Sequence, residues 1–152
     1  WHIHFIEADV IDEINIRQAV LRGMKECIKQ VLLKTDPKAN NTFLVIDGND
    51  FTGYTLFDND TQLIREVPHI TVEQGDGKFT FIAAASILAK NAHDEYIMDL
   101  CKEHPELIER YGLDTNVGYG TKKHLEGIIE HGITQWHRKT YARCKTAKYA
   151  PL

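Results

Sequence analysis

Apolar and polar residues follow two different periods along this chain, and these periods predict strands and helices in a definite order. In residues 1–8, WHIHFIEA, Ile3 and Phe5 lie two positions apart, which predicts a strand already in mid-course at the first residue. In residues 8–35 the apolar positions recur at helical spacing, which predicts a long helix with one apolar face. Residues 36–41 are polar and predict a loop.

The rest of the chain alternates in the same way. An unbroken apolar run, residues 43–46, is typical of a strand buried on both faces. The remaining expected elements are a loop or irregular hairpin (48–60), a strand (69–74), helices (78–104, 105–111 and 122–131) and a loop (113–121). The helices at 105 and 122 are expected to end at Gly112 and Gly132. This order predicts a single α/β domain over residues 1–152, with at least one parallel crossover.

Charge is distributed unevenly. The 152 residues carry a net charge of −4, yet residues 121–152 hold 7 Lys/Arg against 2 Asp/Glu. Such a basic C-terminal segment is either a solvated helix face or a footprint for phosphates. No apolar run approaches the length of a membrane span, and three widely spaced cysteines match neither a zinc pattern nor a disulfide framework. We therefore expect reduced thiols, no membrane partner and a cytoplasmic location.

Two aspartates each follow a predicted strand. Asp47 ends the apolar run and precedes Gly48, whereas Asp76 lies in EQGDGK before the long helix. Each has an ordinary structural role available, because Asp-Gly favours turns and Asp favours helix N-termini. Both also stand at carboxyl ends of strands, where open α/β sheets place their sites. If the strands are neighbours, these carboxylates share one crevice suited to Mg²⁺ or Mn²⁺ and to phosphodiester hydrolysis.

Two further clusters carry candidate chemistry. After Asp76, the small residues Ala83–Ser86 favour close packing of the helix as a tight wall for the site. Lys90 and Asp94, four residues apart, form either an ion pair or support for the site. In residues 116–124, NVGYGTKKH, two glycines flank Tyr119. That arrangement fits an exposed ring that stacks on a base or bonds a 2′-hydroxyl, or an aromatic packed under its loop.

Taken in order, these segments resemble the type 2 ribonuclease H family, ribonuclease HII. The matching segments are IDEINIRQAVLRGM, FLVIDGN, EQGDGKFTFIAAASILAKNAHDEY, NVGYGTKKHLEGIIEHGIT and HRKTY. They span nearly the whole chain, and GDGK…AAASILAK with GYGTKKH…HG…HR is their most specific part. The resemblance implies a ribonuclease H-like mixed β-sheet flanked by helices. It implies Mg²⁺- or Mn²⁺-dependent endonucleolytic cleavage of RNA in RNA/DNA hybrids and at ribonucleotides embedded in duplex DNA, leaving 3′-hydroxyl and 5′-phosphate ends.

The resemblance also assigns roles to residues. Asp47 and Asp76 match two of the family's four catalytic, metal-binding acidic residues. Tyr119, with Gly118 beside it, matches the tyrosine that senses the ribonucleotide–deoxyribonucleotide junction, and Asn15 falls where the family contacts the nucleic-acid backbone. The pattern AAS…AK…D contributes three more positions, Ser86 and Lys90 as substrate-binding residues and Asp94 as support behind the site.

The chain departs from the family in several places. His93 precedes Asp94 where the family usually has arginine, and Val117 precedes Gly118 where it usually has lysine. The family's initial Asp-Glu pair and its Ala-Gly-Arg-Gly loop have no counterpart, since Asp12-Glu13 is followed by Ile14-Asn15 and matches a later family segment.

These departures lead us to expect the larger, C-terminal part of such an enzyme, without its first strands. The whole enzyme is expected to be a monomer. The part present should expose a sheet edge or an apolar face, bind metal weakly and cleave little. The alternative is a catalytically incomplete module that only binds hybrid duplexes. Codons for Asp-Glu-Ala-Gly-Arg-Gly in frame upstream of Trp1 would favour the enzyme.

Overall fold

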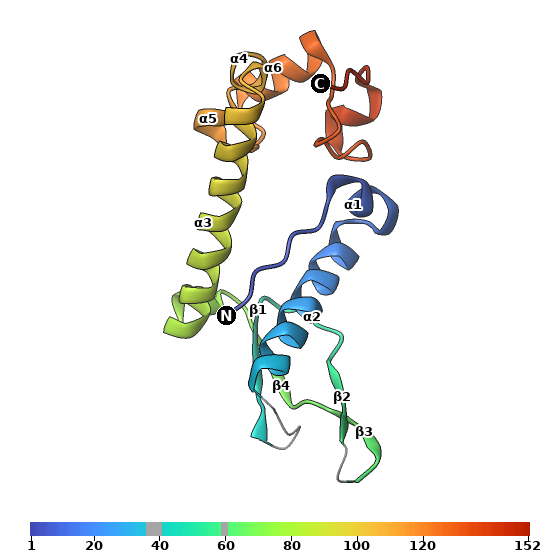
Figure 1. Cartoon of the computed structure of the whole chain (residues 1–152), viewed down its shortest axis with the longest axis vertical. Coiled ribbons are helices and arrows are strands. Elements are labelled where there is room, and N and C mark those ends of the chain that lie inside the picture. The colour runs from blue at the N-terminus through green and yellow to red at the C-terminus, as the bar shows by residue number, and fades with distance from the viewer. Residues whose placement is uncertain (36–40, 59–60) are drawn as a thin grey trace. The chain divides into compact units, whose positions relative to one another are not determined.

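The chain has a mixed α/β fold, as expected from the sequence (Figure 1). The structure, a computed structural model, describes residues 1–35, 41–58 and 61–152. Five of the six residues of the predicted loop 36–41 therefore lie outside the described residues. The chain divides into two compact units. The first unit contains Trp1–His4 and Val20–Ala89, and the second unit contains Phe5–Ala19 and Lys90–Leu152.

The N-terminal segment differs from its prediction. Residues 1–7 form no strand, because no described strand pairs with them, and the first element is helix α1, Ala8–Ile14. Helix α2, Ile16–Thr35, follows after a single residue. That residue, Asn15, has a φ of 67°, and its Oδ1 accepts the Gln18 amide at 3.1 Å. The predicted long helix is therefore interrupted once, where Asn15 caps α2.

The described residues of the first unit form two strand pairs (Figure 1). Strand β1, Leu44–Asp47, pairs in parallel with β4, His69–Val72, in a register that sets Asp47 opposite Val72. Strands β2, Thr55–Asp58, and β3, Leu63–Glu66, form an antiparallel hairpin in the connection. The predicted parallel crossover is confirmed, although the connection carries a hairpin in place of a helix.

Burial in the first unit is lower than the sequence suggested. Strand β1 is only half-buried, so the expectation of a strand covered on both faces is wrong. Among the small residues of helix α3, Thr80–Glu103, the stretch Ala84–Ser86 is exposed, so the expected tight wall is also wrong. The expected apolar exposure is confirmed, with Ile64 73% and Ile70 44% exposed.

The second unit is helical and has the clearer core. It contains α4, Glu106–Tyr111, α5, Leu113–Asn116, α6, Lys122–His131, and a 3₁₀ turn, η3, Ala142–Thr146. Helices α4 and α6 end at Gly112 and Gly132 as predicted, whereas the predicted loop at 113 begins with the short helix α5. The core residues are Leu100, Cys101, Leu107, Tyr111, Leu113, Ile128 and Ile133.

Helices α4 and α6 approach each other backbone to backbone at Gly127. A Cβ on Gly127 would lie 2.1 Å from the Arg110 carbonyl oxygen, so only glycine permits this approach. Tyr111 is fully buried beside it, and its hydroxyl donates to the Gly132 carbonyl at 3.0 Å. The three cysteines are free, as expected. Among the described helices, none combines the length and apolarity that a bilayer crossing requires.

Candidate functional site

Asp47 and Asp76 lie at or just beyond the carboxyl ends of two neighbouring strands, β1 and β4. Asp47 is the last residue of β1, and the chain leaves β4 at Val72 to reach the 3₁₀ turn η2, Gly75–Gly77. The Gly75 amide donates to Asp47 Oδ1 at 2.8 Å, which ties the turn carrying Asp76 to the Asp47 carboxylate. The predicted adjacency of the two strands is thereby confirmed.

Close packing fixes this turn. A Cβ on Gly75 would lie 3.1 Å from Asp47 Oδ1 and 2.7 Å from Ile82 Cδ1, so glycine lets the backbone approach the carboxylate without displacing either side chain. Lys78 Nζ donates to the Glu73 carbonyl at 2.7 Å across the turn. Asp76 Oδ1 accepts the Gly77 amide at 2.9 Å, so this oxygen of Asp76 bonds within its own turn.

The donor chemistry of the two aspartates fits a hard divalent cation, but the number of donors is small. Both side chains are exposed, which leaves carboxylate oxygens open to a cation and its water shell. Nowhere in the described ranges do three or more His, Cys, Asp or Glu side chains gather into a metal site. Asp47 and Asp76 could therefore supply only part of the coordination of a Mg²⁺ or Mn²⁺ ion.

Asp12 is engaged elsewhere. Its carboxylate accepts the Lys139 and Thr140 amides at 2.6 and 2.9 Å and the Thr140 hydroxyl at 2.5 Å. Desolvation opposes ionisation, but these hydrogen bonds and the Lys139 charge outweigh it and lower the pKa of Asp12. Asp12 thus anchors the basic C-terminal segment to α1, a structural role that agrees with its rejection as a catalytic substitute.

Hydrogen bonds fix the backbone of the loop that carries Tyr119, whereas the Tyr119 ring is exposed to solvent. The Tyr119 ring is 62% exposed, which favours the exposed form of the two loop arrangements considered from sequence. The buried Asn116 side chain donates to the Tyr111 carbonyl at 2.7 Å and accepts the Gly118 amide at 3.0 Å. The Tyr119 amide donates to the Asn116 carbonyl at 2.8 Å. Asn116 therefore sets the backbone on which Tyr119 is displayed.

The other predicted residues are divided between the two units. Asn15 and Ser86 are exposed, and Ser86 belongs to the first unit with Asp47 and Asp76. Lys90 and Asp94 belong to the second unit. Within the described chain Asp94 pairs with His93 at 3.1 Å and not with Lys90, so the ion-pair alternative is wrong.

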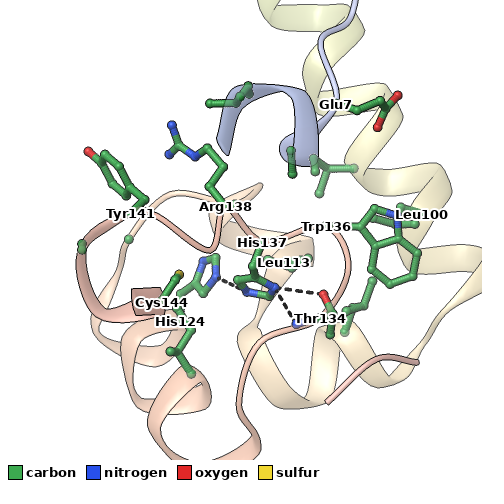
Figure 2. Close-up of a pocket in the computed structure, with 18 of the residues that line it drawn as sticks. Glu7, Leu100, Leu113, His124, Thr134, Trp136, His137, Arg138, Tyr141 and Cys144 are labelled. Atoms are coloured by element: carbon green, nitrogen blue, oxygen red, sulfur yellow. Dashed lines mark hydrogen bonds between the residues drawn. The ribbon is translucent and has the colours of Figure 1, made fainter. Parts of the chain in front are cut away.

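The second unit also contains a cavity of about 470 Å³ (Figure 2). Apolar side chains such as Leu100 and Trp136 line it, and Arg138 and Tyr141 contribute polar groups. His124 and His137 point toward each other in this region, and their Nε2 atoms are 3.2 Å apart. Neither Asp47 nor Asp76 lines the cavity.

Sequence reasoning missed this histidine pair and its neighbours. His124 is 7% exposed and Thr134 fully buried, and His137 accepts the Thr134 amide on Nδ1 at 3.1 Å. Desolvation lowers the pKa of both histidines, and for His137 the neighbouring His124 adds to the effect and brings the pKa to about 4. The segments GYGTKKH and HG…HR contain both histidines, but their 13-residue separation gives no sign of contact.

Comparison with known proteins identifies the family of this chain. The family model described as Ribonuclease HII matches residues 1–145. A Ribonuclease HII of Parabacteroides distasonis is 43% identical over 93% of this chain and 61% of its own length. A second, of Phocaeicola vulgatus, is 42% identical over 93% of this chain and 60% of its own length. This chain, which spans about 60% of the length of the curated relatives it matches, belongs to the ribonuclease HII family.

Proposed function

We propose that this chain supplies metal-binding and substrate-binding parts of a cytoplasmic ribonuclease HII-type endonuclease. The enzyme would hydrolyse the RNA strand of RNA/DNA hybrids and cut at ribonucleotides embedded in duplex DNA, producing 3′-hydroxyl and 5′-phosphate ends. One observation carries the proposal: Asp47 and the turn holding Asp76 follow paired parallel strands at one sheet edge, joined by the Gly75 amide.

The two aspartates would act as fixed oxygen ligands. Bound Mg²⁺ or Mn²⁺ supplies Lewis-acid activation of water and neutralises the charge that develops on the phosphate. Asp47 is oriented before substrate arrives, because the Gly75 amide holds one of its oxygens. Asp76 is oriented in the same way by the Gly77 amide. The protein would therefore position its ligands with little rearrangement.

Substrate contact would come from Tyr119 and from the basic C-terminal segment. A rigidly displayed aromatic ring can stack on a base or sugar, and its hydroxyl can bond a 2′-hydroxyl. Arg138 lies over the Tyr141 ring at 4.2 Å, and Lys139 lies over the Tyr149 ring at 4.7 Å, so cations and aromatic rings alternate along the segment. Such a surface favours phosphates flanked by sugars and bases.

Because the described residues bring together no group of three or more possible metal ligands, residues 1–152 alone should cleave slowly. The test is a duplex with one embedded ribonucleotide, labelled at one end and incubated with the chain and Mn²⁺, with products resolved on a denaturing gel. We expect cleavage near the uncatalysed background. Any enzymatic product should vanish in Asp47→Asn and Asp76→Asn but persist in Asp99→Asn, which alters an exposed surface pair with Lys102.

Two results would contradict this account. Cleavage that survives Asp47→Asn would remove Asp47 from the catalytic machinery. Robust cleavage that depends on Asp47 would show that two carboxylates suffice. The exposure of Tyr119 favours a second candidate, a hybrid-binding module without catalysis. Its signature is salt-sensitive binding to hybrid duplexes that persists in Asp47→Asn and weakens in Tyr119→Ala.

A further inference from the structure

A chain of hydrogen bonds runs from a buried threonine to the backbone of Tyr119. The Thr134 amide and hydroxyl lie 3.1 and 2.9 Å from His137 Nδ1. His137 Nε2 lies 3.2 Å from His124 Nε2, and His124 Nδ1 lies 3.1 Å from the Tyr119 carbonyl oxygen. Figure 2 shows the Thr134, His137 and His124 links of this chain.

The two ends of this hydrogen-bond chain fix one consistent set of proton positions on the two rings. An amide N–H can only donate, so His137 Nδ1 is an acceptor and the ring proton of neutral His137 sits on Nε2. A carbonyl can only accept, so the proton of His124 sits on Nδ1. The link between the rings is then consistent, because His137 Nε2–H faces the bare Nε2 of His124. The two histidines must therefore be opposite tautomers.

The series of hydrogen bonds from Thr134 to Tyr119 exists only while both histidine rings are neutral. A second proton on His137 would set an N–H against the Thr134 amide, and a second proton on His124 would set two N–H groups face to face. The fully buried Tyr111 packs its ring 4.9 Å from His137 and 5.7 Å from His124. Burial keeps the rings uncharged, because it lowers the pKa of both.

Other titratable and charged groups surround the pair within the second unit. Those that line the same cavity are Glu7 before α1, His93 and Tyr96 of α3, Arg138 and Tyr141 of the C-terminal segment, and Arg143 and Cys144 of η3. Burial raises the pKa of the Cys144 thiol, which keeps that neighbour neutral as well.

The series of hydrogen bonds ends at the backbone carbonyl of Tyr119. The Tyr119 carbonyl accepts the Thr121 amide at 2.8 Å as well as His124 Nδ1 at 3.1 Å, so the peptide after the ring has two donors. Asn116 holds the peptide before the ring. We infer that His137 and His124 are positioning residues that fix Tyr119 for nucleic-acid contact through this one-directional chain of hydrogen bonds. The inference rests on the proposed role of Tyr119 in substrate binding.

The first test concerns the unaltered protein. In the ¹⁵N-labelled chain at pH 7, long-range correlation of the ring nitrogens with the carbon-bound ring protons shows which nitrogen of each histidine carries hydrogen. We expect the proton on Nε2 of His137 and on Nδ1 of His124. A proton on Nδ1 of His137, or on Nε2 of His124, would overturn the inference. This readout does not depend on any activity.

The second test measures the affinity for a ribonucleotide-containing duplex by fluorescence anisotropy. His137→Asn keeps an oxygen near the Thr134 amide but cannot reach His124, so affinity should fall about five- to tenfold, the size expected for one lost positioning hydrogen bond. In the Tyr119→Ala background the same substitution should change affinity less than about twofold. The control, His4→Asn, alters an exposed histidine of the first unit, outside both the hydrogen-bond chain and the basic C-terminal segment, and should leave affinity unchanged.

The outcomes separate the two proposals. An unchanged affinity in His137→Asn, or an equal loss in both backgrounds, would contradict positioning of Tyr119 by the histidines. An unchanged affinity in Tyr119→Ala would contradict the proposed role of Tyr119 in substrate binding. It would also contradict a role of the hydrogen-bond chain in that binding. The tautomers of His124 and His137 would still confirm or refute the hydrogen-bond chain itself.

Discussion

Substitution of Gly127 by alanine tests the packing of α6 on α4, on which the display of Tyr119 and His124 depends. An added Cβ would lie 2.1 Å from the Arg110 carbonyl oxygen and 2.9 Å from Tyr111 Cδ1, whereas ordinary van der Waals contact begins at 3.4 Å. The first neighbour is backbone, so no side-chain rotation can relieve the overlap. Helix α6 must move away from α4 by about 1 Å, and the well-packed core must follow.

Two opposing effects set the magnitude. Overpacking in a core costs ~1–3 kcal/mol, and a backbone obstacle places Gly127→Ala at the upper end, about 3 kcal/mol. Alanine within a helix recovers about 1 kcal/mol relative to glycine. The free energy of unfolding should therefore fall by about 2 kcal/mol. For a domain of this size that corresponds to a decrease in Tm of ~4–8 °C.

Denaturant unfolding followed by Trp136 fluorescence provides the assay. Trp136 is half-buried and its ring lies 4.8 Å from His104, whereas Trp1 is 78% exposed and should change little on unfolding. The matched control is Gly120→Ala, whose Cβ would meet only Leu125 Cδ2 at 4.0 Å and should alter stability by less than about 0.5 kcal/mol. Equal stability of Gly127→Ala and the unaltered chain would refute the reasoning.

Three further predictions concern the second unit. Tyr111→Phe removes the hydroxyl that donates to the Gly132 carbonyl at 3.0 Å, and should lower the free energy of unfolding by ~1–2 kcal/mol in denaturant. The control is Tyr141→Phe at an exposed position, which should leave the free energy of unfolding almost unchanged. Similar losses in both variants would contradict the account. His137 has a pKa of about 4 when folded against 6.5 otherwise, so its contribution to stability is complete above pH 6.5 and is lost as pH falls toward 4. Between pH 7 and pH 5 the unaltered chain should lose about 2 kcal/mol that His137→Asn does not lose, and parallel pH profiles would count against a buried neutral ring. Val117 has a φ of 41°, a left-handed conformation that is strained for a β-branched residue. Val117→Asn should therefore raise the free energy of unfolding by about 1 kcal/mol. A lower Tm in this variant would show that the conformation carries no strain.

The positions of Asp47 and Asp76 could be predicted because they depend on local signals. An apolar run that ends in Asp-Gly marks the end of a strand, and a second strand followed by GDG marks another. Parallel pairing then brings both carboxyl ends to one edge, which β1 and β4 confirm. The glycine endings of α4 and α6 were predictable for the same reason, since each is encoded within a few residues.

The errors arose where long-range partners decide the outcome. Ile3 and Phe5 have the period of a strand, but without a partner strand among the described residues the segment stays irregular. Ala84–Ser86 has the size for close packing, yet the structure leaves it exposed. The contact of Asp12 with Thr140 joins residues 128 positions apart, and that of His124 with His137 depends on how α6 packs. No periodicity in the sequence encodes these contacts.

The most direct test of the central claim is a Mn²⁺ titration of the ¹⁵N-labelled chain, read by paramagnetic broadening of its amide signals. If Asp47 and Asp76 hold a hard cation at one sheet edge, the amides of Gly48, Gly75 and Gly77 should broaden first, and Asp47→Asn should abolish the effect. Broadening that begins elsewhere, or that is unchanged in Asp47→Asn, would contradict a metal site at the ends of β1 and β4.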